Sequence, residues 1–128
     1  MSLLRVLIVD DDEAVRSLLR MTLPSDDYEI AEARDGREAL ERLEADAPDL
    51  ILLDWRMPGL GGSSVLDAVK VQHPRLPVIV LTSEIQEHHR ALAESLGVDA
   101  FLTKPFSPLE LLGTIERLLA ERPLDEPS

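Results

Sequence analysis

The sequence contains no cysteine, and aromatic side chains make up only 3% of its 128 residues. Without cysteine, the chain has neither a disulfide framework nor thiolate chemistry, which fits a reducing cytoplasm. The shortage of aromatic rings argues against stacking on nucleobases. No apolar run approaches the roughly 18 residues of a membrane span, and the first apolar run begins too early for a secretory signal. We therefore expect a cytoplasmic location and no contact with a membrane.

Positive charge is also scarce. The chain has 13 basic against 25 acidic residues, a formal net charge of −12. An acidic chain without a basic cluster is poorly suited to direct binding of nucleic acid or an anionic membrane surface. The length suits one domain with a substantial core. We expect this domain to occupy residues 1–121 and residues 122–128 to be a tail or the start of a linker.

Apolar runs alternate with segments of helical periodicity along the chain. This alternation favours a parallel sheet covered by helices on both faces. The second strand carries charged residues and suits an edge of the sheet. The predicted fold is α/β, a five-stranded parallel sheet in the order 2-1-3-4-5, doubly wound as a flavodoxin-like (βα)5 three-layer sandwich. Strands are expected at about 4–10, 28–33, 49–54, 77–82 and 99–103, and helices at about 13–23, 36–46, 62–73, 84–96 and 107–121.

The helix starts and buried faces can also be predicted. Asp12 is placed to cap the first helix, and the run from Asp35 to Glu38 resembles a capping box at the second. The fourth helix has a thin apolar face, so we expect it to be loosely held. The positions expected to face the core are Val15, Leu18, Leu19 and Thr22, then Ala39, Leu40 and Leu43, then Val65, Leu66 and Val69, then Ile85, Leu92 and Leu96, and finally Leu109, Leu112, Ile115 and Leu119.

Polar side chains stand at the carboxyl ends of four predicted strands. In the predicted strand order, the topological switch lies between strands 1 and 3, and ligands bind outside the carboxyl ends there. Asp10 and Asp11 are therefore expected to face Asp54 across a ligand crevice. The polar residues are Asp10, Asp11 and Asp12 after the first strand, Asp54 at the end of the third, Thr82 at the end of the fourth and Lys104 after the fifth.

This set of side chains suits a divalent cation and a phosphoryl group. Two carboxylates about 4 Å apart repel by roughly 4 kcal/mol at an effective dielectric constant near 20, so the cluster needs a proton or a cation. Oxygen ligands without histidine or cysteine favour Mg²⁺ or a similar ion. Asp54 stands alone at its strand end and is the best nucleophile for an aspartyl phosphate. Lys104 can supply positive charge and Thr82 a hydroxyl hydrogen bond to the phosphoryl oxygens.

Each signal has a simpler interpretation when it is taken alone. The three aspartates at 10–12 could be a helix cap with solvated charge, and Asp54 could be a turn residue. Thr82 could be an ordinary strand residue, and Lys104-Pro105 an ordinary turn. The combination of these residue types at four strand ends, in this order, favours the chemical site.

Four motifs together resemble the receiver domain of bacterial two-component response regulators. They are LIVDDD at 7–12, DWRMPG at 54–59, VLTS at 80–83 and GVDAFLTKPF at 97–106, within a similarity that covers about residues 4–121. The resemblance implies phosphorelay signalling, in which Asp54 accepts a phosphoryl group from a sensor histidine kinase or a phosphotransfer protein. It also implies a switch with its own phosphorylation and autodephosphorylation chemistry rather than a turnover enzyme.

The resemblance also implies which residues hold the metal. Asp11 and Asp54 would ligate Mg²⁺ (or Mn²⁺) directly, together with the backbone carbonyl of Arg56. Asp10 would act mainly through a metal-bound water. Arg56 and Glu84 would flank the attacking water and tune the lifetime of the phosphoryl group.

A further set of residues would respond to phosphorylation. Thr82 and Lys104 would contact the phosphoryl oxygens, and the bond between Lys104 and Pro105 would be cis. Movement of Thr82 would let Phe101 turn inward and reshape the face made by the fourth helix, fifth strand and fifth helix. A downstream effector protein, a covalently linked output domain or a second phosphorylated copy would dock there.

Three other functions compete with this interpretation. A hydrolase similar to haloacid-dehalogenase-type phosphatases needs a second aspartate where Arg56 stands, and a cap domain for which 128 residues leave no room. A nucleotide-binding flavodoxin-like module needs a glycine-rich or hydroxyl-rich loop where the aspartates at 10–12 stand. A pseudo-receiver, folded but unphosphorylated and used for protein docking, is disfavoured because all the chemical residues are present.

Overall fold

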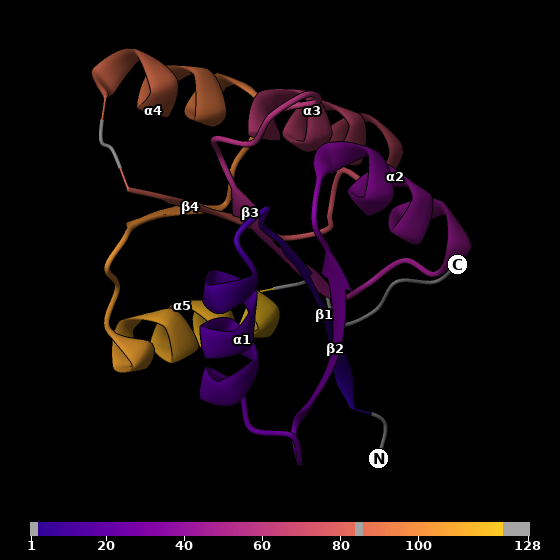
Figure 1. Ribbon diagram of the computed structural model, residues 1–128, viewed down its shortest axis with the longest axis vertical. Helices are drawn as coiled ribbons and strands as arrows, with labels where there is room; N and C mark the ends of the chain where they lie inside the picture. The colour runs from indigo at the N-terminus through magenta and orange to yellow at the C-terminus, as the bar shows by residue number, and fades with distance from the viewer. Residues whose placement is uncertain (1–2, 84–85, 122–128) are drawn as a thin grey trace.

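Five parallel strands form one sheet in the order β2-β1-β3-β4-β5, which confirms the predicted order and the doubly wound α/β fold (Figure 1). The computed structural model describes residues 3–83 and 86–121. Its strands are β1 (Leu4–Val9), β2 (Tyr28–Ala33), β3 (Leu50–Asp54), β4 (Val78–Thr82) and β5 (Ala100–Thr103). Its helices are α1 (Glu13–Thr22), α2 (Gly36–Ala45), α3 (Gly62–Gln72), α4 (Glu87–Ser95) and α5 (Pro108–Ala120). Within the described ranges, none of these helices is long and apolar enough to cross a bilayer.

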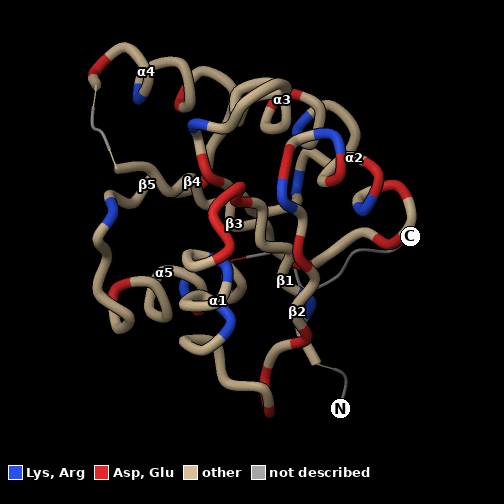
Figure 2. The backbone as a smooth tube through the Cα atoms, in the orientation of Figure 1, with Lys and Arg blue, Asp and Glu red and all other residues tan. Residues whose placement is uncertain are grey.

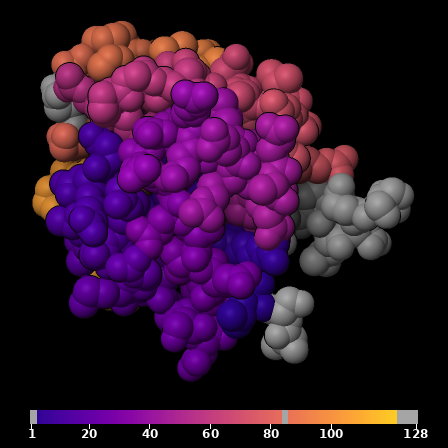
Figure 3. Space-filling view, turned by 45° about the vertical axis from the view of Figure 1, so that its right-hand side comes forward, coloured from indigo at the N-terminus to yellow at the C-terminus, as the bar shows by residue number. Residues whose placement is uncertain are grey.

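The helices cover the two faces of the sheet unequally. Helices α2, α3 and α4 lie on one face, and α1 and α5 lie on the other (Figure 1). Figure 3 is turned toward the α2 side and shows residues from the first half of the chain forming most of that surface. Because successive strand residues point to opposite faces, β3 contributes alternately to two hydrophobic layers. Its Ile51 and Leu53 pack with α2, α3 and α4, whereas its Leu50 and Leu52 pack with α1 and α5.

Two helix starts are capped as the sequence predicts. The Asp12 side chain accepts a hydrogen bond from the Ala14 amide at 2.9 Å. At α2, Asp35 accepts from the Glu38 amide at 2.8 Å, and the Glu38 side chain accepts from the Arg34 amide at 2.8 Å. The pair resembles a capping box, except that Glu38 accepts from the amide of Arg34, one residue before the N-cap residue Asp35. Both helices therefore begin directly after a strand end, and α1 begins beside the predicted site.

Three predicted core positions are wrong. Leu18 of α1 is 54% exposed, Leu92 of α4 is 43% exposed and Leu109 of α5 is 81% exposed. In α5 the buried side chains are Leu111, Ile115 and Leu118. These buried residues and the predicted residues Leu109, Leu112, Ile115 and Leu119 both have helical spacing. Periodicity alone therefore does not tell which set faces the core.

Helix α4 has the thin apolar face that the sequence predicts. Ala93 is its only buried residue, and Leu92 is 43% exposed. Leu96, just after the helix, is partly buried against the core, and Ile85 lies outside the described residues. A helix with so little buried apolar surface opens at low free-energy cost.

Gly62 lies against the end of β3. Its amide donates to the carbonyl oxygen of Trp55 at 3.1 Å. A Cβ atom at this position would lie only 2.8 Å from the backbone carbonyl oxygen of Asp54 and from the Cα and carbonyl oxygen of Trp55. Because these are backbone atoms, they have little freedom to move away. The absence of a side chain at Gly62 therefore lets α3 start close to the strand that carries Asp54.

We expect Gly62→Ala to lower the free energy of unfolding by about 1–3 kcal/mol, since the added methyl group overpacks the strand end. Gly113→Ala is the matched control, because Gly113 is exposed within α5 and a Cβ there meets nothing within 4 Å. The free energy of unfolding of the control should rise by about 0.5–1 kcal/mol, because alanine has a higher helix propensity than glycine. Urea unfolding measures both, and equal stabilisation of the two variants would contradict the packing argument.

Candidate functional site

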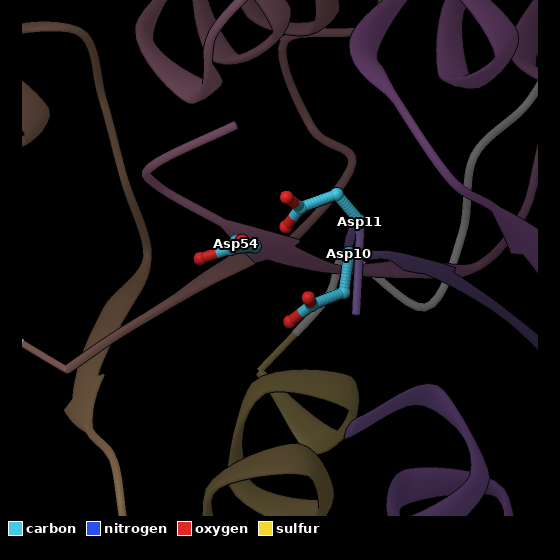
Figure 4. Close-up of side chains that lie close together, drawn as sticks. All are labelled: Asp10, Asp11 and Asp54. Atoms are coloured by element: carbon cyan, nitrogen blue, oxygen red, sulfur yellow. The ribbon is translucent and has the colours of Figure 1, made fainter. Parts of the chain in front are cut away.

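Three carboxylates meet at the carboxyl ends of β1 and β3. One carboxylate oxygen from each of Asp10, Asp11 and Asp54 lies within 4.8 Å of the others. Figure 4 shows Asp10 and Asp11 reaching this place from the segment after β1, and Asp54 from the end of β3. Asp10 is 1% exposed and Asp54 is 6% exposed, whereas Asp11 is exposed to solvent. In Figure 2 the acidic run after β1 stands out as a continuous red segment. The sequence-based expectation that these side chains face one another is met.

The segment after β1 is fixed by one hydrogen bond to β2 and one within the turn. The Asp10 amide donates to the Ala33 carbonyl at 3.1 Å, which continues the pairing of β1 with β2. The Asp10 side chain accepts from the Asp12 amide at 2.9 Å, and Asp12 then caps α1. Asp10 therefore takes part both in the turn from strand to helix and in the carboxylate cluster.

Asp54 is held by the pairing of β3 with β4. The next amide, that of Trp55, donates to the Leu81 carbonyl at 3.1 Å, so the strand pairing extends past Asp54. The Arg56 amide lies 3.4 Å from Oδ1 of Asp54, a weak hydrogen bond at the start of the loop. The position of the Arg56 carbonyl as a metal ligand stays a prediction. The nucleophile candidate is thus at a fixed strand end, with a backbone donor beside one oxygen.

Lys104 bridges the two buried carboxylates. Its Nζ lies 2.9 Å from Oδ2 of Asp10 and 3.5 Å from Oδ1 of Asp54. The Lys104 amide donates to the Thr82 carbonyl at 2.7 Å, and the peptide bond from Lys104 to Pro105 is cis. Thr82 is 2% exposed at the end of β4. The fold therefore brings the lysine, the threonine and the carboxylates to one edge of the sheet.

The site perturbs the acid–base behaviour of its members. Burial raises the pKa of Asp54 to about 7, and the negative charge of Asp10 and a hydrogen bond with Asp11 add to the rise. The charge of Lys104 and the Arg56 amide act in the opposite direction. Burial by itself would lower the pKa of Lys104, but its hydrogen bond to Asp10 and the charges of both aspartates raise it. Lys104 thus stays protonated at neutral pH, whereas Asp54 is close to its titration midpoint.

The donor chemistry of the site fits a hard divalent cation. The three candidate ligands are all carboxylate oxygens, and the group contains no nitrogen or sulfur donor. Oxygen-only sets of this kind suit Mg²⁺ and Mn²⁺. Lys104 supplies only one positive charge against three carboxylates, so negative charge remains to attract a cation. A cation would also offset the negative charge of Asp10, which adds to the effect of burial on the pKa of Asp54.

The predicted switch residue Phe101 lies farther along the sheet. Phe101 of β5 is half-buried against the layer that includes α3 and α4. The guanidinium carbon of Arg90, on α4, lies 5.3 Å from the centre of the Phe101 ring. This cation–π contact links β5 directly to α4. Glu84, which the sequence pairs with Arg56, lies outside the described residues.

Sequence reasoning missed Arg16. Its Nη1 donates to the backbone carbonyl oxygen of Asp10 at 2.6 Å, and its Nε pairs with Glu32 at 3.0 Å. The available signal was its place in the first turn of a helix that starts next to the acidic run. A basic residue there is unusual near a helix amino terminus, where negative side chains are favoured.

Comparison with known proteins gives consistent matches. A family model described as response regulator receiver domain matches residues 6–116. The alkaline phosphatase synthesis transcriptional regulatory protein PhoP of Bacillus subtilis is 36% identical over 124 residues, covering 97% of this chain and 52% of that protein. Response regulator MprA of Mycolicibacterium vanbaalenii is 39% identical over 122 residues, covering 95% and 53%. The chain therefore spans about half the length of the curated relatives it matches.

Solved structures agree with these matches. A CheY-like response regulator receiver domain protein from Methanospirillum hungatei has a TM-score of 0.91 at 30% identity, with 94% of this chain and 97% of that chain covered. The chemotaxis protein CheY4 of Vibrio cholerae has a TM-score of 0.85 at 34% identity, with coverage of 91% and 99%.

In buffer with EDTA, we expect Asp54→Asn to be more stable than the wild type at pH 8. The folded-state pKa of Asp54 is raised from 3.8 to about 7, so ionisation destabilises the fold increasingly as the pH rises between these values. The gain should be on the order of 2–4 kcal/mol at pH 8, since one pKa unit corresponds to about 1.4 kcal/mol, and should shrink toward pH 4.

Urea unfolding at several pH values, followed by the fluorescence of Trp55, measures this gain. Asp67→Asn, at an exposed position of α3, is the control and should stay within about 0.5 kcal/mol of the wild type. An Asp54→Asn protein that is less stable than the wild type at pH 8 would contradict the burial argument.

Proposed function

Because the chain belongs to the response regulator receiver domain family, we propose that it is a phosphorelay switch in which Asp54 is the phosphoacceptor. The donor is a phosphohistidine on a sensor histidine kinase or a phosphotransfer protein. The protein promotes its own phosphorylation and dephosphorylation and is not a turnover enzyme. The observation that carries this proposal is the meeting of Asp10, Asp11 and Asp54 within 4.8 Å, with Lys104 between two of them.

Asp10, Asp11 and Asp54 would hold Mg²⁺ or Mn²⁺, with the Arg56 carbonyl as a further ligand. When bound, the cation would supply positive charge that favours ionised Asp54 and offsets the charge of the phosphoryl oxygens. Asp11 is the exposed member of the group, so it is open to a cation arriving from solvent. Asp10 already accepts bonds from Lys104 and the Asp12 amide, which suits a supporting role through a water.

The group transfer is a nucleophilic displacement at phosphorus. A carboxylate oxygen of Asp54 forms the new O–P bond while the P–N bond of the phosphohistidine breaks. The electron pair of that bond returns to the imidazole nitrogen, which takes up a proton from solvent. Lys104 and Thr82 stabilise the charge on the phosphoryl oxygens, because a protonated amine and a hydroxyl both donate hydrogen bonds. The signal would end by hydrolysis, in which water attacks phosphorus, the bond between phosphorus and Asp54 breaks, and inorganic phosphate leaves.

Phosphorylation would change the face formed by α4, β5 and α5. A phosphoryl group competes with Asp10 and Asp54 for Lys104 and draws on the Thr82 hydroxyl at the end of β4. Phe101 would then turn inward from its half-buried position beside Arg90. Helix α4 suits such a change because Ala93 is its only buried residue. Moving a two-state element from 1:99 to 99:1 needs about 5.5 kcal/mol, which two or three charge-assisted bonds can supply.

The partners on the output side follow from the same face. A downstream effector protein, a covalently linked output domain or a second copy of the phosphorylated chain would dock on α4, β5 and α5. PhoP of Bacillus subtilis is a transcriptional regulatory protein about twice as long as the matched region, which supports a linked output domain as one route. With a net charge of −12, the receiver itself would not contact nucleic acid or a membrane directly. We expect it to act in the cytoplasm.

Incubation with acetyl phosphate and Mg²⁺, followed by intact mass measurement, tests the proposed phosphoacceptor. We expect a gain of one phosphoryl group by the wild type, and no gain by Asp54→Asn or in the presence of EDTA. Asp67→Asn should behave as the wild type does. A folded wild-type protein that binds Mg²⁺ without gaining a phosphoryl group would instead favour a pseudo-receiver that docks partners without phosphorylation.

We expect Lys104→Ala to remain partly phosphorylatable but to lose the response of α4, β5 and α5. The lysine supplies a charge-assisted bond of about 1.5–3 kcal/mol to the phosphoryl group, a large part of the energy available to the switch. Hydrogen exchange of the amides in α4, β5 and α5, with and without acetyl phosphate, measures the response. Arg37→Ala removes an exposed charge from α2 and is the control. A normal phosphorylation-dependent exchange change in Lys104→Ala would refute the coupling.

A further inference from the structure

A partly buried guanidinium connects three segments next to the carboxylate cluster. Arg16 lies in the first turn of α1 and donates from Nη1 to the Asp10 carbonyl oxygen at 2.6 Å. Its Nε donates to Oε1 of Glu32, on β2, at 3.0 Å. The two side chains are only 14% and 28% exposed. A single side chain therefore joins α1, β2 and the segment that follows β1.

The acceptor of the Arg16 bond has a special position in the chain. The Asp10 carbonyl belongs to the peptide unit between Asp10 and Asp11, the two carboxylates that β1 delivers to the site. Strand β1 ends at Val9, so this peptide unit lies beyond the β1 residues that pair with β2 and β3. A rotation of that unit would change the direction of both side chains. The guanidinium fixes its orientation from outside the site.

We propose that Arg16 is a positioning residue for the divalent-cation site, held in its own orientation by Glu32. It keeps Asp10 and Asp11 turned toward Asp54 before a cation binds, so that binding needs little rearrangement. This inference rests on the proposed function, because its ligand is the cation bound by Asp10, Asp11 and Asp54. The planar fork of arginine makes the arrangement possible, since it presents two donors in fixed directions and lysine does not.

The sign of the effect separates positioning from simple electrostatics. Arg16 carries a positive charge near a site for a cation, so its charge alone repels Mg²⁺. If charge were its only influence, neutralising Arg16 would tighten Mg²⁺ binding. If it positions the aspartates, neutralising it weakens Mg²⁺ binding. Arg20 is a matched control because it carries the same charge and pairs with the same Glu32, but its other bond is to Ser17 rather than to the Asp10 carbonyl.

The experiment measures the Mg²⁺ dissociation constant of the unphosphorylated protein by calorimetry. We expect Arg16→Met to raise this constant about 10-fold, the size typical for loss of a group that orients metal ligands. Arg16→Lys retains the charge and loses the fork, so it should weaken binding nearly as much. Arg20→Met should stay within about twofold of the wild type. Urea unfolding in EDTA is measured on each variant to show that it is folded.

Glu32→Gln provides a variant in which Arg16 is kept and only its orienting partner is neutralised. It should also weaken Mg²⁺ binding, by less than Arg16→Met does. Unchanged or tighter binding in Arg16→Lys and Glu32→Gln, beside a wild type that binds Mg²⁺, would overturn the positioning role and leave the proposed function intact. A wild type that does not bind Mg²⁺ would overturn both. Equal weakening of Mg²⁺ binding by Arg20→Met and Arg16→Met would also overturn the positioning role, since only Arg16 donates a hydrogen bond to the Asp10 carbonyl.

Discussion

Repulsion between carboxylates governs the whole site. The fold buries Asp10 and Asp54 side by side and adds Asp11 at the surface, so its hydrophobic layers must hold together charges that would otherwise separate. Lys104 offsets one charge of this group. Burial and the remaining negative charge together raise the pKa of Asp54, and they leave a site that positive charge would stabilise. Local instability of this kind is typical of functional sites, where the surrounding fold maintains an arrangement that the site alone would not adopt.

Much of this arrangement was predictable from the sequence, because it depends on where strands end. Asp54 and Thr82 are the last residues of two apolar runs, which form the five-residue, fully buried strands β3 and β4. Their polar side chains therefore had to lie at the carboxyl end of the sheet. The parallel order then brings Asp10 to the same end. The caps at Asp12 and Asp35 were equally clear, since an N-cap needs only a short polar side chain at the start of a helical pattern.

What the sequence could not supply depends on tertiary packing. Leu18 and Leu109 fit the helical pattern, but the rotation of each helix about its axis is set by the sheet beneath it, and both side chains are exposed. The role of Arg16 depends on the meeting of β2 with α1, which places Glu32 beside a residue sixteen positions away. The rotation of a helix and the partner of Arg16 both depend on contacts between segments that are distant in the sequence. A charged residue in a first helical turn has many possible partners, so its sequence position alone does not identify the one it has.

The division of the core into two layers has an evolutionary consequence. The side chains that pack under α1 and α5 belong to a different set from those under α2, α3 and α4, and the backbone of the sheet separates them. Volume changes in one layer are therefore not compensated by repacking in the other. Substitutions that adapt α4 to a new partner can accumulate without requiring matching changes beneath α1 and α5. The fold can thus vary α4 while the half of its interior beneath α1 and α5 stays constant.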